Sequence, residues 1–283
     1  MIVVTGATGY LGRLVIAALL KKVPASGIVA AVRNVEKARD LAALGVKVRQ
    51  ADYNQPSTWD DALARADKVL LISSSEVGQR AKQHRSVIDA ARRAGVKLLA
   101  YTSVLRADSS PLGLAVEHKE TEALIRASGI PFTLLRNSWY TENYTAGIPG
   151  ALAQGAVYGC AGEGRIASAA RVDYAEAAAY VLTAESQAGR IYELAGDTAF
   201  TLEDLAAEIS RQSGRNIGYV NLPEVEFKNV LIKAGLPEPV AALLSDSDTG
   251  ISKGALFDDG HQLSKIIGRP TTSLATAVAA AMK

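Results

Sequence analysis

The feature that most constrains this chain is a set of three glycines that directly follows a short apolar run. Ile2–Val4 is apolar and β-branched, and the next stretch reads Thr5-Gly6-Ala7-Thr8-Gly9-Tyr10-Leu11-Gly12. In a strand–turn–helix unit the first glycine permits the tight turn, the second lets a pyrophosphate approach the backbone, and the third lets the helix pack on the strand. N–H groups at the helix N-terminus then hold the diphosphate. A glycine-rich turn in an ordinary α/β protein is the alternative interpretation, but the context favours a dinucleotide site formed by residues 6–12.

Short apolar runs alternate with amphipathic helical patterns through the first half of the chain. Such runs, apolar on both faces, are typical of strands buried in a parallel sheet. The expected strands are Ile2–Val4, Ile28–Val32, Val46–Arg49, Val69–Ile72, Leu98–Tyr101 and Phe132–Leu135. Strands and helices in this alternation predict an α/β fold, a Rossmann-type doubly wound parallel sheet.

The pattern changes after Asn137, which suggests a second domain. An aromatic-rich loop and a glycine-rich stretch follow, and then a helix at 173–184 that we expect to return to the first domain. We expect a further strand at 191–195 and a helix that begins after Thr201. The prediction is a nucleotide-binding domain of residues 1–137 with a return segment at about 165–190. Residues 138–164 and 191–283 form a smaller, mainly helical domain.

The end of the second strand indicates which dinucleotide is bound. Proteins that bind NAD carry Asp or Glu there, about 20 residues past the glycines, to hold the ribose hydroxyls. This chain has Arg33 followed by Asn34. A guanidinium binds a 2′-phosphate well, so the pair predicts NADP(H), with a solvated surface arginine as the alternative. Ser73, Ser74 and Ser75 follow the fourth strand, where ligands of open parallel sheets sit.

Composition excludes several other classes of function. The formal net charge is +2 without a block of like charge, so no nucleic-acid or membrane partner is expected. Cys160 is the single cysteine, so no internal disulfide can form. We find no removable leader, no apolar stretch of spanning length and no metal-ligand spacing, and we expect a cytoplasmic protein.

Several strings together resemble the NmrA-like, atypical short-chain dehydrogenase/reductases. They are Gly6-x-x-Gly9-x-x-Gly12, Arg33-Asn34, Tyr101–Ser103, Ser128–Asn137 and Glu142-Asn143. Further stretches resemble one branch of that family, the bacterial type 2 NADPH:quinone oxidoreductases and triphenylmethane reductase. These stretches are Leu70–Arg80, Tyr192–Asp197, Ser252–Gly254 and Leu256–Asp259.

The resemblance implies further site residues. In that branch the loop after the sixth strand contacts the cofactor, as does an arginine further along the chain. The positions that match are Asn137, Ser138, Trp139, Tyr140, Thr141, Glu142 and Arg171. We also place Thr102, at the end of the fifth strand, beside the cofactor. Trp139, Tyr140 and Tyr144 could stack on a planar acceptor, or could fill a core.

The catalytic Tyr-x-x-x-Lys pair of most short-chain dehydrogenases is missing. Its two positions fall on Leu114 and His118. Ser103 and His118 are the remaining catalytic candidates, against the alternatives of a turn hydroxyl and an exposed helix residue, and His84 on an apolar stripe reads as a core histidine. The missing pair disfavours alcohol or simple ketone chemistry. It fits hydride transfer to a quinone or a cationic dye, which demands less of an acid and rests on positioning.

We therefore expect an NADPH-dependent quinone reductase whose partner is a small planar acceptor such as a quinone, with triphenylmethane-type dyes as further acceptors. The alternative is an NmrA-type regulator that binds NADP(H) without turnover and reports redox state to a protein partner. A sugar-nucleotide epimerase shares the glycine spacing, but the missing Tyr–Lys pair argues against it.

Overall fold

The computed structural model describes residues 1–283, which form two compact units. Unit 1 consists of residues 1–107, 117–137 and 171–192, and unit 2 consists of residues 108–116, 138–170 and 193–283. Unit 1 therefore includes a segment, 171–192, that comes back from beyond the first part of unit 2.

Unit 1 is built around a parallel sheet. Its strands are β1 (Ile2–Val4), β2 (Ile28–Val32), β3 (Lys47–Gln50), β4 (Lys68–Leu71), β5 (Leu98–Val104), β6 (Phe132–Asn137) and β8 (Arg190–Leu194). The order across the seven-stranded sheet is β3-β2-β1-β4-β5-β6-β8. The neighbours from β3 to β6 pair in parallel. Successive strands from β1 to β3 are added toward one edge of the sheet, and those from β4 onward are added toward the other edge. The strand order therefore reverses between β1 and β4, at the topological switch point of the sheet. The α/β, Rossmann-type prediction is confirmed.

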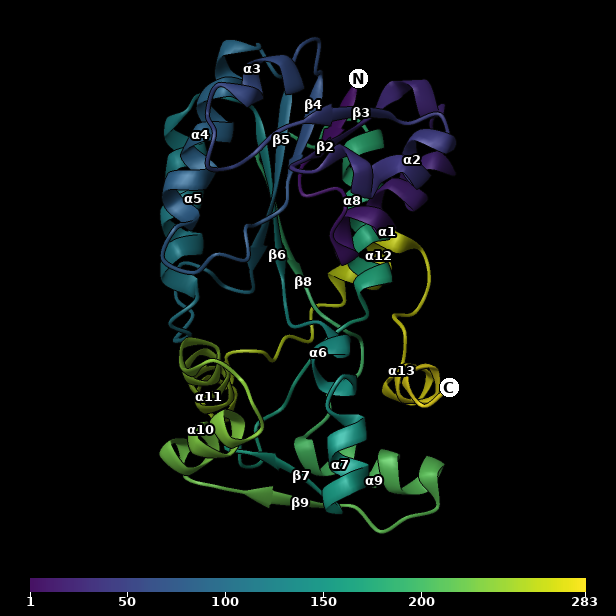
Figure 1. The fold of residues 1–283 in the computed structure, drawn as a ribbon, viewed down its shortest axis with the longest axis vertical. Helices are drawn as coiled ribbons and strands as arrows, with labels where there is room; N and C mark the ends of the chain where they lie inside the picture. Colours follow the sequence, from purple (N-terminus) through teal and green to yellow (C-terminus); the bar gives the residue numbers. More distant parts are fainter. The chain divides into compact units, whose positions relative to one another are not determined.

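Helices cover both faces of this sheet, as Figure 1 shows. They are α1 (Tyr10–Leu20), η1 (Ala25–Gly27), η2 (Val35–Ala38), α2 (Arg39–Ala43), α3 (Thr58–Ala62), α4 (Arg80–Arg93), α5 (Ala115–Ala127) and α8 (Arg171–Thr183). One face carries α1, α2 and α8, and the other carries α3, α4 and α5. Because both faces are covered, every residue of β2 and β5 is buried.

Unit 2 is mostly helical but also contains a small sheet. Its elements are α6 (Thr141–Thr145), α7 (Ile148–Gln154), β7 (Ala156–Gly159), α9 (Leu202–Ser213), β9 (Gly218–Asn221), α10 (Glu224–Lys233), α11 (Glu238–Ser252), α12 (Gln262–Ile267) and α13 (Leu274–Ala281). Strands β7 and β9 pair in parallel, an addition to the predicted helical domain. The expected cap at Thr201 is confirmed, because Thr201 and Asp204 form a reciprocal capping box at the start of α9.

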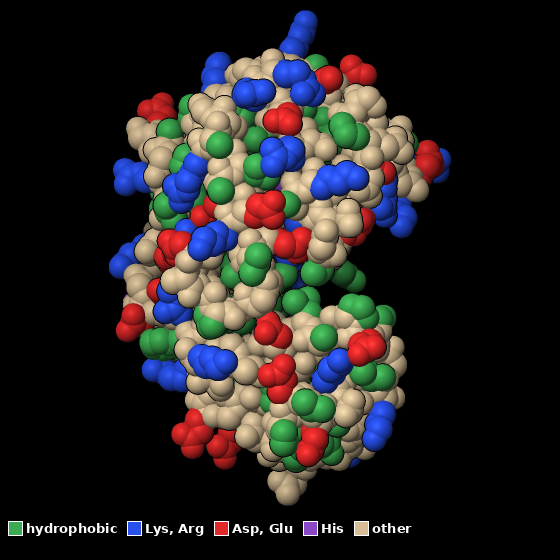
Figure 2. All heavy atoms as spheres, turned by 90° about the vertical axis from the view of Figure 1, so that its left-hand side faces the viewer, with side chains coloured by type: hydrophobic (Ala, Val, Ile, Leu, Met, Phe, Trp, Pro, Cys, Tyr) green, Lys and Arg blue, Asp and Glu red, His purple; other side chains and the backbone are tan.

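The molecular surface carries both signs of charge. On the face in Figure 2, acidic and basic side chains are interspersed rather than gathered by sign. No helix has both the length and the apolar character needed to cross a membrane. No group of three or more His, Cys, Asp or Glu side chains is arranged to hold a metal ion.

Candidate active site

The glycine loop takes the conformation that its spacing predicts. Gly6 has a φ of +56°, a left-handed conformation that side chains rarely adopt, and the Gly9 N–H donates to its carbonyl at 2.9 Å. A Cβ on Gly12 would lie 2.5 Å from the Gly6 carbonyl oxygen and 2.7 Å from the Ala7 Cα. Gly12 is therefore required for α1 to pack this closely on the loop after β1.

The N-terminus of α1 is open to an anion. Gly9 is the N-cap residue, no side chain caps the helix, and its first turn contains no acidic residue. The partial positive charge of the first N–H groups is therefore not neutralised locally. Thr8 directly precedes this N-cap residue, and Leu11 lies in the first turn of α1. Tyr10 is 84% exposed, and the Arg171 guanidinium lies 5.8 Å from the centre of its ring. The structure thus brings Arg171, which is 161 positions after Tyr10, to the glycine loop predicted to bind the diphosphate.

Arg33 and Asn34 stand at the end of β2, and they differ in how they are held. The Arg33 side chain is 73% exposed, and its guanidinium lies 3.9 Å from the Glu76 carboxylate. Asn34 caps η2, because its side-chain oxygen accepts the Glu36 N–H at 2.9 Å. Both residues are exposed, and Asn34 also fixes the turn that follows Arg33. Their contacts with the cofactor stay predictions.

Behind this turn, Arg13 connects α1 to η2 and α2. Its Nε donates to the Thr8 carbonyl at 3.3 Å, one terminal nitrogen donates to the Lys37 carbonyl at 2.6 Å, and the other pairs with Asp40. Arg13 thereby holds the glycine loop and the turn after Arg33 in one arrangement. The sequence reasoning missed this residue, although its position directly after Gly12 was a usable signal.

The Ser73–Ser75 segment is held by its backbone. The Ser73 N–H donates to the Thr102 hydroxyl at 2.9 Å, which ties the end of β4 to the end of β5. The Ser74 N–H donates to His84 Nε2 at 2.9 Å, so the His84 proton sits on Nδ1, 2.9 Å from the Thr121 hydroxyl. Burial lowers the pKa of His84 to about 3, helped by the charge of Arg80, and keeps the ring a neutral acceptor. His84 is thus the buried core histidine that was expected. Ser75 is exposed.

The two catalytic candidates are buried inside unit 1. The Ser103 hydroxyl donates to Glu122 Oε1 at 2.6 Å, and Arg136 pairs with both oxygens of Glu122. His118 Nδ1 lies 2.7 Å from the Tyr101 hydroxyl, and burial lowers the pKa of His118 to about 3. Ser103 lies in β5 rather than in a turn, and His118 is buried rather than exposed, so neither residue fits its alternative interpretation. Their catalytic roles stay predictions.

Asn137 ends β6 and provides a buried acceptor. Its backbone carbonyl accepts the Leu105 N–H at 2.9 Å. Its side-chain oxygen is buried and has no hydrogen-bond partner in the protein. A buried acceptor without a hydrogen bond lowers the stability of the protein. The side-chain oxygen of Asn137 is therefore suited to a ligand that donates a hydrogen bond.

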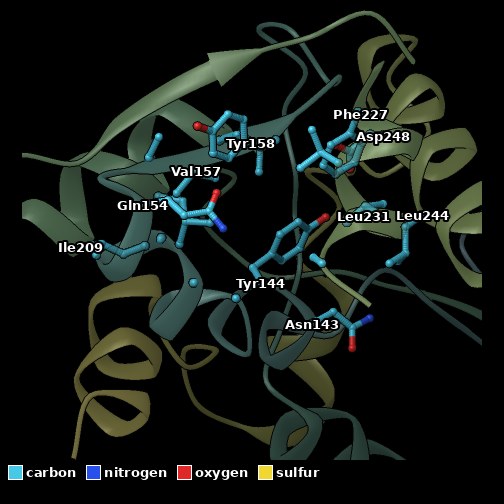
Figure 3. Close-up of a pocket in the computed structure, with 18 of the residues that line it drawn as sticks. Asn143, Tyr144, Gln154, Val157, Tyr158, Ile209, Phe227, Leu231, Leu244 and Asp248 are labelled. Carbon is cyan, nitrogen blue, oxygen red and sulfur yellow. The ribbon is translucent and has the colours of Figure 1, made fainter. Parts of the chain in front are cut away.

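The rest of the predicted loop belongs to unit 2. Ser138 donates its N–H to the Leu194 carbonyl at 2.7 Å, and the Thr141 hydroxyl lies 2.9 Å from that of Ser168. Tyr140 forms a bridge with Ala169, and Glu142 lies in α6. Trp139 and Tyr144 line a cavity of about 250 Å³ in unit 2, and Tyr140 does not. Figure 3 shows Tyr144 beside this space.

Comparison with known proteins places the chain in a family. The profile of the NmrA-like family matches residues 1–276. Quinone oxidoreductase 2 of Escherichia coli is 59% identical over 278 residues, which cover 98% of this chain and 97% of that protein. The NADPH-dependent quinone oxidoreductase of E. coli, solved in complex with NADPH, superposes with a TM-score of 0.98 at 57% identity, and each chain is covered completely. The Citrobacter sp. triphenylmethane reductase complexed with NADP(H) gives a TM-score of 0.96 at 43% identity over 99% of this chain and 100% of that one. These matches confirm the resemblance drawn from the sequence, and the chain belongs to the NmrA-like family.

Proposed function

We propose that this chain is an NADPH-dependent reductase that transfers hydride to quinones, with triphenylmethane-type dyes as further acceptors. The observation that carries the proposal is the 59% identity, over nearly the whole length, to quinone oxidoreductase 2 of E. coli. The solved E. coli relative is a complex with NADPH, and the Citrobacter relative that reduces triphenylmethane dyes, by its name, is a complex with NADP(H).

The residues of unit 1 fit NADPH. The uncapped start of α1 and the close approach allowed by Gly12 suit a diphosphate, with Arg171 near the same turn. Arg33 supplies an exposed guanidinium where a 2′-phosphate would be recognised. The unmatched acceptor oxygen of Asn137 suits an amide N–H, such as that of the nicotinamide carboxamide. When bound, NADPH supplies two electrons and one hydrogen nucleus to the acceptor.

In this proposal the chain's own residues bind and orient rather than move protons. The hydrogen bonds from Ser73 to Thr102 and from Ser74 to His84 hold the loop after β4 at the switch point of the sheet. We assign Ser103 and His118 a positioning part, because Ser103 is bonded to Glu122 and His118 to Tyr101 within the buried interior. A quinone also takes up one proton to become a hydroquinone. Because the hydroquinone oxyanion is a weak base, it can form without an acid beside it, and the proton can then come from solvent. The protein would then accelerate the reaction mainly by aligning NADPH with the quinone.

The proposal also includes a cytoplasmic location, which suits the free thiol of Cys160. The experiment that tests the function is steady-state NADPH oxidation with a simple soluble quinone, beside a blank without quinone. We expect turnover that saturates in quinone and is much slower with NADH. NADPH that binds tightly but is never oxidised above the blank would refute the reductase and favour the NmrA-type regulator.

A further inference from the structure

The cavity in unit 2 is large enough for a small aromatic molecule. Its volume is about 250 Å³, and its wall is contributed by α6, α7, β7, α9, α10 and α11. Figure 3 shows Tyr144, Val157 and Leu231 among the side chains around this space. An apolar cavity of roughly 150 Å³ already accepts benzene. The space here is therefore suited to a planar molecule of one or two rings.

One acidic side chain, Asp248 of α11, lies in this otherwise uncharged wall (Figure 3). The residue is only 9% exposed. Its Oδ2 accepts the Cys160 N–H at 3.0 Å, and no other group of the protein donates to the carboxyl. Burial raises the pKa of Asp248 to about 6, and no basic side chain opposes this rise. At neutral pH the protein therefore holds a buried carboxylate without a counter-charge.

Stability alone does not account for a carboxylate at this place. The single N–H of Cys160 could be accepted equally well by an amide oxygen, which has no charge to desolvate. The backbone nevertheless packs closely against this carboxyl group. A Cβ on Gly159 would lie 2.8 Å from Asp248 Oδ2 and 2.4 Å from Leu202 Cδ1, so only glycine fits beside Asp248. A buried acceptor with remaining capacity, facing an apolar space, is the arrangement expected where a ligand brings the missing donor.

We propose that this cavity binds a planar aromatic hydroxyl compound of one or two rings, whose O–H donates to Asp248. A quinone oxygen only accepts hydrogen bonds, as does an ionised carboxylate, so the pair would repel. A hydroquinone offers two O–H donors. The site therefore prefers the reduced product of the reaction over the quinone, an inference that rests on the proposed function for its choice of ligand class.

The test is calorimetric titration of the full chain, without NADPH, at about pH 7.5. The probes are 2-naphthol and 2-methoxynaphthalene, which have the same two rings but differ in the O–H donor. We expect 2-naphthol to bind at least about tenfold more tightly, the ratio that one hydrogen bond to a charged group gives. Asp248→Asn keeps an acceptor for the Cys160 N–H and should reduce the ratio to near one. Glu238→Gln, on the same helix but exposed and paired with Lys228, should leave the ratio unchanged.

A second variant tests the location of the bound ring. Ala151 lines the cavity from α7 and is buried, so Ala151→Phe should fill the space and abolish binding of both probes. Failure of the wild-type chain to bind 2-naphthol, an unchanged probe ratio in Asp248→Asn, or unchanged binding in a folded Ala151→Phe would each overturn the inference. None of these titrations involves turnover. If the probes behave as expected but NADPH is not oxidised with quinones, the proposed function fails while the aromatic hydroxyl site stands.

Discussion

Replacing Arg33 by alanine should change the cofactor preference rather than the fold. Arg33 is 73% exposed and its partner Glu76, at 3.9 Å, is itself 47% exposed. An ion pair of this kind contributes about 0–1 kcal/mol, so little is lost from the free protein and little opposes a ligand that replaces Glu76. A hydrogen bond to a charged group contributes about 1.5–3 kcal/mol. After up to about 1 kcal/mol is given up with the Glu76 pair, about 0.5–3 kcal/mol remains, so Arg33→Ala should weaken NADPH binding roughly 2- to 160-fold.

The assay is equilibrium titration of NADPH and NADH, each followed by cofactor fluorescence, with the wild-type chain and two variants. NADH has no 2′-phosphate, so its dissociation constant should change less than about twofold in Arg33→Ala. Arg39→Ala is the matched control, because Arg39 is also exposed and pairs with Glu36 three residues away in the same segment. Equal losses for NADPH and NADH in Arg33→Ala, or equal effects of the two arginine variants on NADPH, would refute the assignment of Arg33 to the 2′-phosphate.

Three further variants test the packing and the electrostatics. Gly12→Ala places a Cβ 2.5 Å from the Gly6 carbonyl, so it should shift α1 and reduce affinity for both dinucleotides, measured by the same titration. Glu122→Ala removes the carboxylate that holds the Arg136 guanidinium, which is 5% exposed, through two hydrogen bonds, and should lower the free energy of unfolding by about 3–5 kcal/mol in urea titrations. Burial raises the pKa of Asp248 from 3.8 to about 6. The folded wild-type chain is therefore destabilised as pH rises from about 4 to about 6, and this destabilisation is absent below about pH 4. Asp248→Asn should abolish this loss, which is at most roughly 3 kcal/mol in the free energy of unfolding. The variant should therefore be more stable than wild type at about pH 8 but not at about pH 4, and equal stabilities at about pH 8 would contradict the argument.

The parts of the molecule that could be predicted from the sequence are those whose structure is determined by residues adjacent in the chain. The run from Ile2 to Gly12 specifies its own strand, turn and helix, because the glycines act through local backbone geometry. The place of Arg33 at a strand end could be predicted because the strand before it is apolar throughout, so the end of that strand is easy to locate.

Strands β7 and β9 show where this reasoning stops. Each has four residues and is mostly exposed or half-buried, so neither has the apolar run that marks a buried strand. Their pairing joins Ala156 to Gly218, a contact that no local pattern specifies. Asp248 was missed for the same reason, since it meets Cys160 only through the fold of unit 2.

His118 illustrates a different limit. Charged neighbours in sequence, Glu117, Lys119 and Glu120, suggested an exposed position, but the buried face of α5 also includes the polar residues Thr121 and Glu122. A helix face that is buried through hydrogen bonds and an ion pair does not produce the apolar periodicity that reveals buried positions.

The most direct test of hydride transfer is a single turnover. The chain is loaded with one equivalent of NADPH, an excess of a soluble quinone is added, and the absorbance of the reduced nicotinamide is followed, once with ordinary NADPH and once with deuterium at the transferred position. The account predicts that all bound NADPH is oxidised and that deuterium slows the reaction. Bound NADPH that survives the excess of quinone would contradict it.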